Sequence, residues 1–192
     1  MSTTETATRV LDGIELPPVG TYTFDPSHTT VEFIGTHMFT KTRGRFTEAE
    51  GTIEIAERPE DSKVDVVIKA GSLQSNSEQR DGHLKSPDFL NVDEYPQITF
   101  KSTAFRHAGG ATFELDGDLQ IKDLTNPVTL MGEFLGYATN PFDKVSAGFT
   151  ASTKIEREDW GMTWNMALEA GGFLVGRTVT IEVEVEALKS ED

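Results

Sequence analysis

Hydrophobic and polar residues alternate along most of the chain from Tyr22 onward. The clearest case is residues 178–186 (TVTIEVEVE), where valine or isoleucine at every second position alternates with threonine and glutamate. Successive side chains of a β-strand point to opposite faces of a sheet, so this pattern predicts a strand with one apolar face and one polar face. Eight further segments show the same period and are predicted to be strands: 21–25, 29–37, 45–56, 64–68, 98–104, 113–121, 126–138 and 144–156.

Eight or nine short strands separated by turn signals are typical of an all-β barrel or sandwich. The turn signals are clusters of proline, glycine and short polar residues at 58–61, 108–110 and 140–141. One stretch, 76–86, looks helical instead, because Asn76 or Ser77 is a suitable N-cap and Pro87 would end the helix. We therefore predict an antiparallel up-and-down β-barrel or a sandwich, with one short helix.

The first 19 residues differ from the rest of the chain. Their few apolar residues are interrupted by Asp12, Gly13 and Glu15, so no continuous apolar run of the kind found in a secretory signal forms. We expect a polar N-terminal tail at 1–19, a single domain at 20–189 and a cytoplasmic protein, with a mature secreted chain as the alternative. The sequence also lacks the run of roughly 20 apolar residues that a membrane helix needs, so stable membrane insertion is not expected.

Charge and cysteine content exclude several functional classes. Lys and Arg number 17 against 32 Asp and Glu, a formal net charge of −15, which argues against nucleic-acid binding. The absence of cysteine excludes disulfides, zinc–thiolate sites, iron–sulfur clusters and thiol nucleophiles. Lys41, Arg43 and Arg45 are the local exception, because no acidic residue occurs between Phe33 and Thr47.

The four histidines offer little evidence for catalysis or metal binding. They lie on separate segments without the short spacings of metal motifs, and no nucleophile elbow, P-loop or dinucleotide fingerprint occurs. We expect no metal, no cofactor and no catalytic residue. The enzyme alternative would require His37, His83 and Asp81 to converge in one pocket as acid–base groups.

The predicted apolar strand faces and the 12 phenylalanines and two tryptophans raise the question of what fills the barrel. A barrel of about eight strands either fills its interior with side chains or holds one small ligand. Periodicity alone does not distinguish these two outcomes.

Five short blocks, in order, resemble the YceI family over residues 22–188. They are YTFDPSH (22–28) with VEF (31–33); HM (37–38) with RGRF (43–46) and EG (50–51); QRD (79–81), HLKS (83–86) and DF (88–89) with YPQITF (95–100); GDL (117–119) with TNPV (125–128); and DWGMTWN (159–165) with GG (171–172).

The resemblance implies an extended, lipocalin-like barrel with a long hydrophobic lumen. It implies a non-enzymatic protein that binds and sequesters or carries a long-chain isoprenoid lipid, such as an isoprenoid quinone or a polyprenyl phosphate. The alternatives are an enzyme acting on an apolar or prenylated substrate, and a stress-related structural protein with a filled core. A homodimer that shields the barrel mouth is compatible with the sequence.

The resemblance and the apolar strand faces together give a candidate site. A neutral quinone head group needs only one or two hydrogen-bond donors, whereas a phosphate needs cations such as the cluster at 41–45, and the sequence slightly favours the neutral head group. The predicted lumen residues are Phe33, Met38, Leu84, Phe89, Phe100, Trp160 and Trp164, and the predicted polar-end residues are His37, Arg43, Arg45, Arg80, His83 and Asn165.

Overall fold

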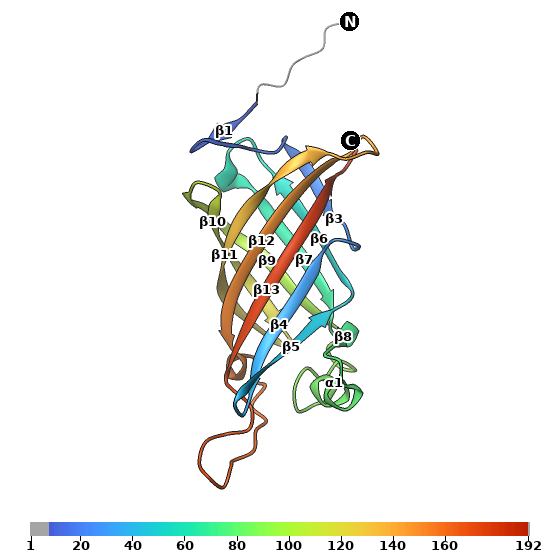
Figure 1. The fold of residues 1–192 in the computed structure, drawn as a ribbon, viewed down its shortest axis with the longest axis vertical. Coiled ribbons are helices and arrows are strands. Elements are labelled where there is room, and N and C mark those ends of the chain that lie inside the picture. The colour runs from blue at the N-terminus through green and yellow to red at the C-terminus, as the bar shows by residue number, and fades with distance from the viewer. Residues whose placement is uncertain (1–7, 192) are drawn as a thin grey trace, which may run out of the picture.

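A computed structural model describes residues 8–191 and shows an antiparallel barrel built almost entirely of strands (Figure 1). A long sheet of eleven strands contains all the barrel strands. Their bounds are β3 Gly20–Phe24, β4 Thr30–His37, β5 Thr40–Phe46, β6 Ala49–Ile55, β7 Lys63–Lys69, β8 Leu73–Gln74, β9 Gln97–Gly109, β10 Thr112–Ile121, β11 Leu124–Thr139, β12 Val145–Glu156 and β13 Thr178–Lys189.

Six of these strands join in pairs to make three longer barrel strands. Both β3 and β4 pair with β13, at its C-terminal and N-terminal halves respectively, so together they form one interrupted first strand. In the same way β5 and β6 pair with β4 and β3, and β7 and β8 pair with β6 and β5. The barrel therefore has eight strands in chain order, and the pairing of β13 with both β12 and the first strand closes it. The up-and-down prediction is confirmed.

The alternation read from the sequence determines which face of each strand is buried. In β13, Ile181 and Val183 lie opposite Phe33 and Val31 of β4. These four side chains point into the barrel, while the intervening glutamates face outward. Because burial of apolar surface is the main gain on folding, this pattern fixes the register of the closing strand.

The helix α1 (Glu78–Lys85) lies at one end of the barrel, together with the β4–β5 turn and the loop 161–177; we call this end, at the bottom of Figure 1, the lower end. Ser77 is the N-cap, as predicted, and its side chain accepts a hydrogen bond from the Arg80 N–H at 3.3 Å. Among residues 8–191 no helix is long and apolar enough to span a membrane. Short 3₁₀ turns occupy η1 Pro59–Asp61, η2 Ala70–Ser72 and η3 Arg157–Trp160.

The N-terminal segment was predicted to be a polar tail through residue 19, but the structure shows that part of it is folded. Residues 1–7 lie outside the described residues, whereas β1 (Val10–Leu11) and β2 (Ile14–Glu15) form a small hairpin at the opposite, upper end (Figure 1). Arg9 fastens it there, because its guanidinium donates to the Ala56 carbonyl at 2.6 Å and to the Pro17 carbonyl at 2.9 Å. These long-range contacts leave no periodic signal in the sequence.

We expect Tyr22 to make the fold sensitive to alkali. Its side chain is fully buried, its hydroxyl donates to the Pro18 carbonyl at 2.9 Å, and burial, aided by Tyr137, raises its pKa to about 12. The neutral phenol is favoured in the folded state, so its contribution is complete below about pH 10 and is lost as the pH rises towards 12. Urea unfolding should show a loss of about 2–3 kcal/mol over this interval. Tyr22→Phe should remove most of that step; an equal alkaline loss in the variant would contradict the assignment.

Candidate functional site

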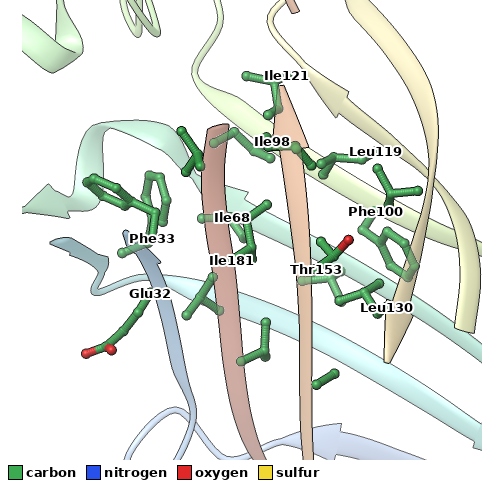
Figure 2. Close-up of a pocket in the computed structure, with 18 of the residues that line it drawn as sticks. Glu32, Phe33, Ile68, Ile98, Phe100, Leu119, Ile121, Leu130, Thr153 and Ile181 are labelled. Carbon is green, nitrogen blue, oxygen red and sulfur yellow. The ribbon is translucent and has the colours of Figure 1, made fainter. Parts of the chain in front are cut away.

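The interior of the barrel is a cavity of about 820 Å³ with an overwhelmingly apolar wall. Figure 2 shows Phe33, Ile181, Thr153, Leu130 and Phe100 pointing towards one space from different strands. A cavity of this size is within the range that holds small-molecule ligands. The interior is therefore hollow, which argues against the alternative of a structural protein with a filled core.

The cavity stays open because aromatic rings lie along its wall. A Cβ atom placed on Gly44 would lie 2.3 Å from Cζ of Phe33, and one placed on Gly132 would lie 2.2 Å from Cζ of Phe113. In both pairs the phenylalanine lies directly opposite its glycine on the neighbouring strand. The ring thus rests on bare backbone instead of extending across the barrel. Phe24 rests on Gly51 and Phe100 on Gly117 in the same kind of contact, although Phe100 lies opposite Leu119 in the strand register.

An aromatic cluster lies at the lower end of the cavity, where α1 meets the loop 161–177. The rings of His83 and Trp164 are perpendicular with centroids 4.5 Å apart, and Phe89 lies 5.1 Å from His83 and 5.6 Å from Trp164. Nε2 of His83 is 2.9 Å from Oδ2 of Asp88, which orients the imidazole. All three rings line the cavity, so this end combines apolar surface with a polar ring nitrogen.

Arg157 is a buried cation in the wall at the same end. Its side chain is 2% exposed, its guanidinium carbon lies 5.8 Å from the centroid of Phe89, and among residues 8–191 no ion pair engages it. Nε donates to the Gly176 carbonyl at 2.8 Å, while the Nη atoms donate to the carbonyls of Met162 and Val175. Burial lowers its pKa, although Glu158 opposes that shift. Three of its five N–H groups are thus used, which leaves donor capacity at the cavity wall.

The sequence analysis did not select Arg157. A single arginine at the end of an alternating segment looks like a surface residue, and nothing nearby in the sequence marks it as buried. The available signal was its position two residues before the DWGMTWN block that carries part of the family resemblance.

Eight of the predicted site residues lie in the cavity wall. The apolar ones come from four different parts of the chain, and the polar ones all lie at the lower end. They are Phe33, Leu84, Phe89, Phe100 and Trp164 from the predicted lumen set, and His37, Arg80 and His83 from the predicted polar set.

Two predicted lumen residues lie outside the wall of the cavity. Trp160 is 2% exposed, but its indole Nε1 donates to the Leu119 carbonyl at 3.0 Å and its ring packs in the core beside η3. Met38 occupies the tip of the β4–β5 turn with φ +50°, where its side chain is directed to the surface. The prediction that these two line the lumen is therefore corrected.

Three predicted polar-end residues also lie elsewhere. Arg43 and Arg45 alternate with the inward-facing positions of β5, so both point outward, and Arg43 lies between Glu32 at 2.6 Å and Glu182 at 2.8 Å. Asn165 holds the loop 161–177 together, because its amide donates to the Val175 carbonyl at 2.7 Å and accepts from the Val175 N–H at 2.9 Å. None of the three is in the wall.

The groups required by the enzyme alternative are not brought together by hydrogen bonds. Asp81 accepts a hydrogen bond from the Ser75 hydroxyl, His83 pairs with Asp88, and His37 is exposed at the end of β4. Within the described part of the chain, no hydrogen bond or ion pair links any two of the three. The arrangement gives no acid–base relay.

One group of side chains has the composition of a cation site. Asp25, His28 and Glu186 present ligand atoms that lie within 4.8 Å of one another, at the break between β3 and β4 and outside the cavity wall. Nδ1 of His28 is already 2.8 Å from Oδ2 of Asp25. This hydrogen bond lowers the pKa of Asp25 and raises that of His28, so it favours the ionised form of both side chains. We therefore interpret these residues as a local polar contact that stabilises the break between β3 and β4.

Replacing Gly44 with alanine should narrow the cavity. The new methyl group would force the Phe33 ring off the backbone and into the lumen, at a cost of about 1–3 kcal/mol in stability. Gly35→Ala in the adjacent strand is the matched control, because a Cβ there meets no atom within 4 Å. Thermal unfolding and titration with an environment-sensitive apolar dye would measure both effects. Equal dye binding by the two variants would show that the ring does not set the lumen width.

Replacing Arg157 with methionine should loosen the loop 161–177. The substitution keeps a long side chain but removes the side-chain donor to the carbonyls of Met162 and Gly176 and one of two donors to that of Val175, so we expect a loss of about 2–4 kcal/mol in unfolding free energy. Hydrogen exchange should rise at residues 162 and 174–176 more than in the barrel strands. Arg177→Met, on the exposed side of the same loop, is the control. Unchanged hydrogen exchange in Arg157→Met would show that Arg157 does not hold the two ends of the loop together.

Comparison with known proteins agrees with this geometry. The YceI-like domain family matches residues 22–187. A UPF0312 protein of Staphylococcus aureus is 35% identical over 173 residues, which are 88% of this chain and 98% of that protein. Burkholderia cenocepacia BcnA has the same fold, with a TM-score of 0.75 at 19% identity over 85% of this chain and 98% of BcnA. A polyisoprenoid binding domain from Saccharophagus degradans has a TM-score of 0.64 at 11% identity over 90% of this chain and 100% of that domain. The chain belongs to the YceI-like domain family.

Proposed function

We propose that this protein binds a long-chain isoprenoid lipid inside the barrel and sequesters or carries it. The observation that carries the proposal is the hollow apolar interior of about 820 Å³, which runs from the N-terminal hairpin at the upper end to α1 at the lower end. The polyisoprenoid binding domain of Saccharophagus degradans, which shares the fold, supports the same ligand class.

A branched hydrocarbon chain matches the chemistry of this wall. It has no polar groups to satisfy, and each buried methylene-sized group contributes about 0.8 kcal/mol, or roughly 3–4 kcal/mol for each five-carbon unit. Ordering the chain on binding offsets much of this gain. A few units inside the barrel are therefore sufficient for tight binding.

The polar end of the ligand would lie at the lower end of the cavity. Arg80, His83, His37 and Arg157 line the wall there, and they supply N–H donors beside the aromatic cluster. A group with exposed oxygen acceptors, either the carbonyl of a quinone or the oxygens of a phosphate, suits such donors. The outward cluster at 41–45 does not contribute, because Arg43 and Arg45 face away from the lumen.

The proposal is for binding without catalysis. A catalytic role would need a base or nucleophile with a partner aligned towards the ligand. Two of the candidate acid–base groups of the lower end, Asp81 and His83, are engaged by separate hydrogen bonds. Those bonds hold α1 and its following turn in place, which is the role they take in a binding protein.

Filling the lumen with one side chain should block binding. Ala151 lies in the cavity wall, whereas its neighbour Ser152 is exposed on the outside of β12, so Ala151→Trp and Ser152→Trp are a matched pair. Native mass spectrometry of protein purified without added lipid should detect a hydrophobic ligand in the wild type and in Ser152→Trp. Binding by Ala151→Trp should be at least about tenfold weaker, because the indole occupies the ligand's space.

The same measurement separates the candidate head groups. Ligand-free protein is offered an isoprenoid quinone in one sample and a polyprenyl phosphate in another. Uptake of neither compound, together with no co-purifying lipid, would reject the proposed function.

A further inference from the structure

The tip of the lower end exposes large apolar side chains. Phe39 in the β4–β5 turn is 90% exposed, and Phe173 and Met166 in the loop 161–177 are each 56% exposed. The two segments are in direct contact: the Met38 N–H donates to the Leu174 carbonyl at 2.8 Å, and the Gly176 N–H donates to the Thr36 carbonyl at 2.9 Å. The exposed groups therefore belong to one rigidly joined surface, which we call the apolar tip (residues 38–41 and 161–176).

The apolar tip carries no net charge in a strongly acidic molecule. Its only charged side chains are Lys41 and Glu169, while the chain as a whole carries −15. Just behind it on β5 lie Arg45, which is exposed, and Arg43, which is paired with Glu32 and Glu182. On β13, Glu182 is paired with Arg43, whereas Glu184 and Glu186 follow farther along the barrel wall. The helix α1 lies to one side, and the loop 161–177 extends beyond it (Figure 1).

The same two segments also reach into the cavity. Thr36, His37 and Thr40 line the cavity from the β4–β5 side, and Leu174 and Val175 line it from the loop. In both segments, residues that line the cavity are thus close in sequence to residues that are exposed on the apolar tip. A surface that meets the tip is adjacent to the route by which a ligand would enter or leave the lower end.

We propose that the apolar tip docks onto the surface of a lipid bilayer. Aromatic and methionine side chains on projecting loops can enter the boundary between head groups and acyl chains, and neighbouring cations favour anionic lipids. An otherwise acidic barrel is repelled by such a surface, so the molecule would meet it by this end and with its long axis steeply inclined to the bilayer. The inference rests on the proposed function in one respect: a lipid ligand resides in bilayers, so a carrier must meet one.

Vesicle binding tests the proposal. The full chain is mixed with phosphatidylcholine vesicles, with or without phosphatidylglycerol, and the bound fraction is measured by flotation. Wild type should float with both kinds and more with the anionic ones. The double variant Phe39→Ser, Phe173→Ser should bind about tenfold more weakly to both. Lys41→Glu should weaken binding to the anionic vesicles only.

Phe142→Ser is the matched control, because Phe142 is 82% exposed but lies in the β11–β12 turn at the upper end. It should float as the wild type does. Equal flotation of the double variant, equal loss in the control, or no flotation of the wild type would overturn the docking surface. So would sedimentation showing a dimer that the double variant converts to monomer, because the tip would then meet a second copy.

Failure of the docking surface differs from failure of the proposed function. Phe39 and Phe173 do not line the cavity. The double variant should therefore take up an isoprenoid quinone from solution as the wild type does. Loss of flotation with normal uptake supports docking, whereas flotation without uptake by any variant would leave the docking surface standing and remove the isoprenoid ligand.

Discussion

Contact between phenylalanine rings and the bare backbone of facing glycines determines whether this barrel is hollow. Eight strands enclose a space that inward side chains of ordinary size can fill completely. Here four rings lie along the wall because the neighbouring strand offers no Cβ at the point of contact. The rings keep their burial and their contacts, and the lumen keeps about 820 Å³ of free space. The space available for a ligand depends on that arrangement.

The two ends of the lumen are covered by different means. At the upper end, Arg9 holds the N-terminal hairpin through backbone carbonyls of residues far along the chain. At the lower end, Arg157 holds both ends of the loop 161–177, and the aromatic cluster joins that loop to α1. In each case a guanidinium donates hydrogen bonds to carbonyls of irregular backbone, which satisfies these polar groups beside an apolar space. Both guanidinium groups belong to residues that line the cavity, and at the lower end His37, Arg80 and His83 add further donors.

Much of the fold could be predicted from the sequence because alternation is a local property. The period of two located the strands, and Ser77 with Pro87 delimited the helix. The same period sets whether a side chain points into or out of the barrel. The outward direction of Arg43 and Arg45 could therefore be predicted from the positions of Phe33 and Phe46, although the local excess of positive charge suggested a binding cluster. Arg157 and Arg9 could not be identified, because their partners are carbonyls supplied by distant segments. Trp160 was wrongly predicted to line the lumen, because apolar character does not distinguish a core residue from one in the cavity wall.

The distribution of charge follows from the same division between wall and ends. Carboxylates alternate with inward valines along β13, so they form a negatively charged outer coat around a barrel whose interior is apolar. This coat does not extend over the segments at the lower end, where some residues line the cavity and others are exposed. The β4–β5 turn and the loop 161–177 are segments of that kind, and their exposed positions carry phenylalanine and methionine instead. Exposure of these groups to water contributes nothing to folding, and their placement beside the polar end of the lumen fits the bilayer surface that we propose the lower end meets.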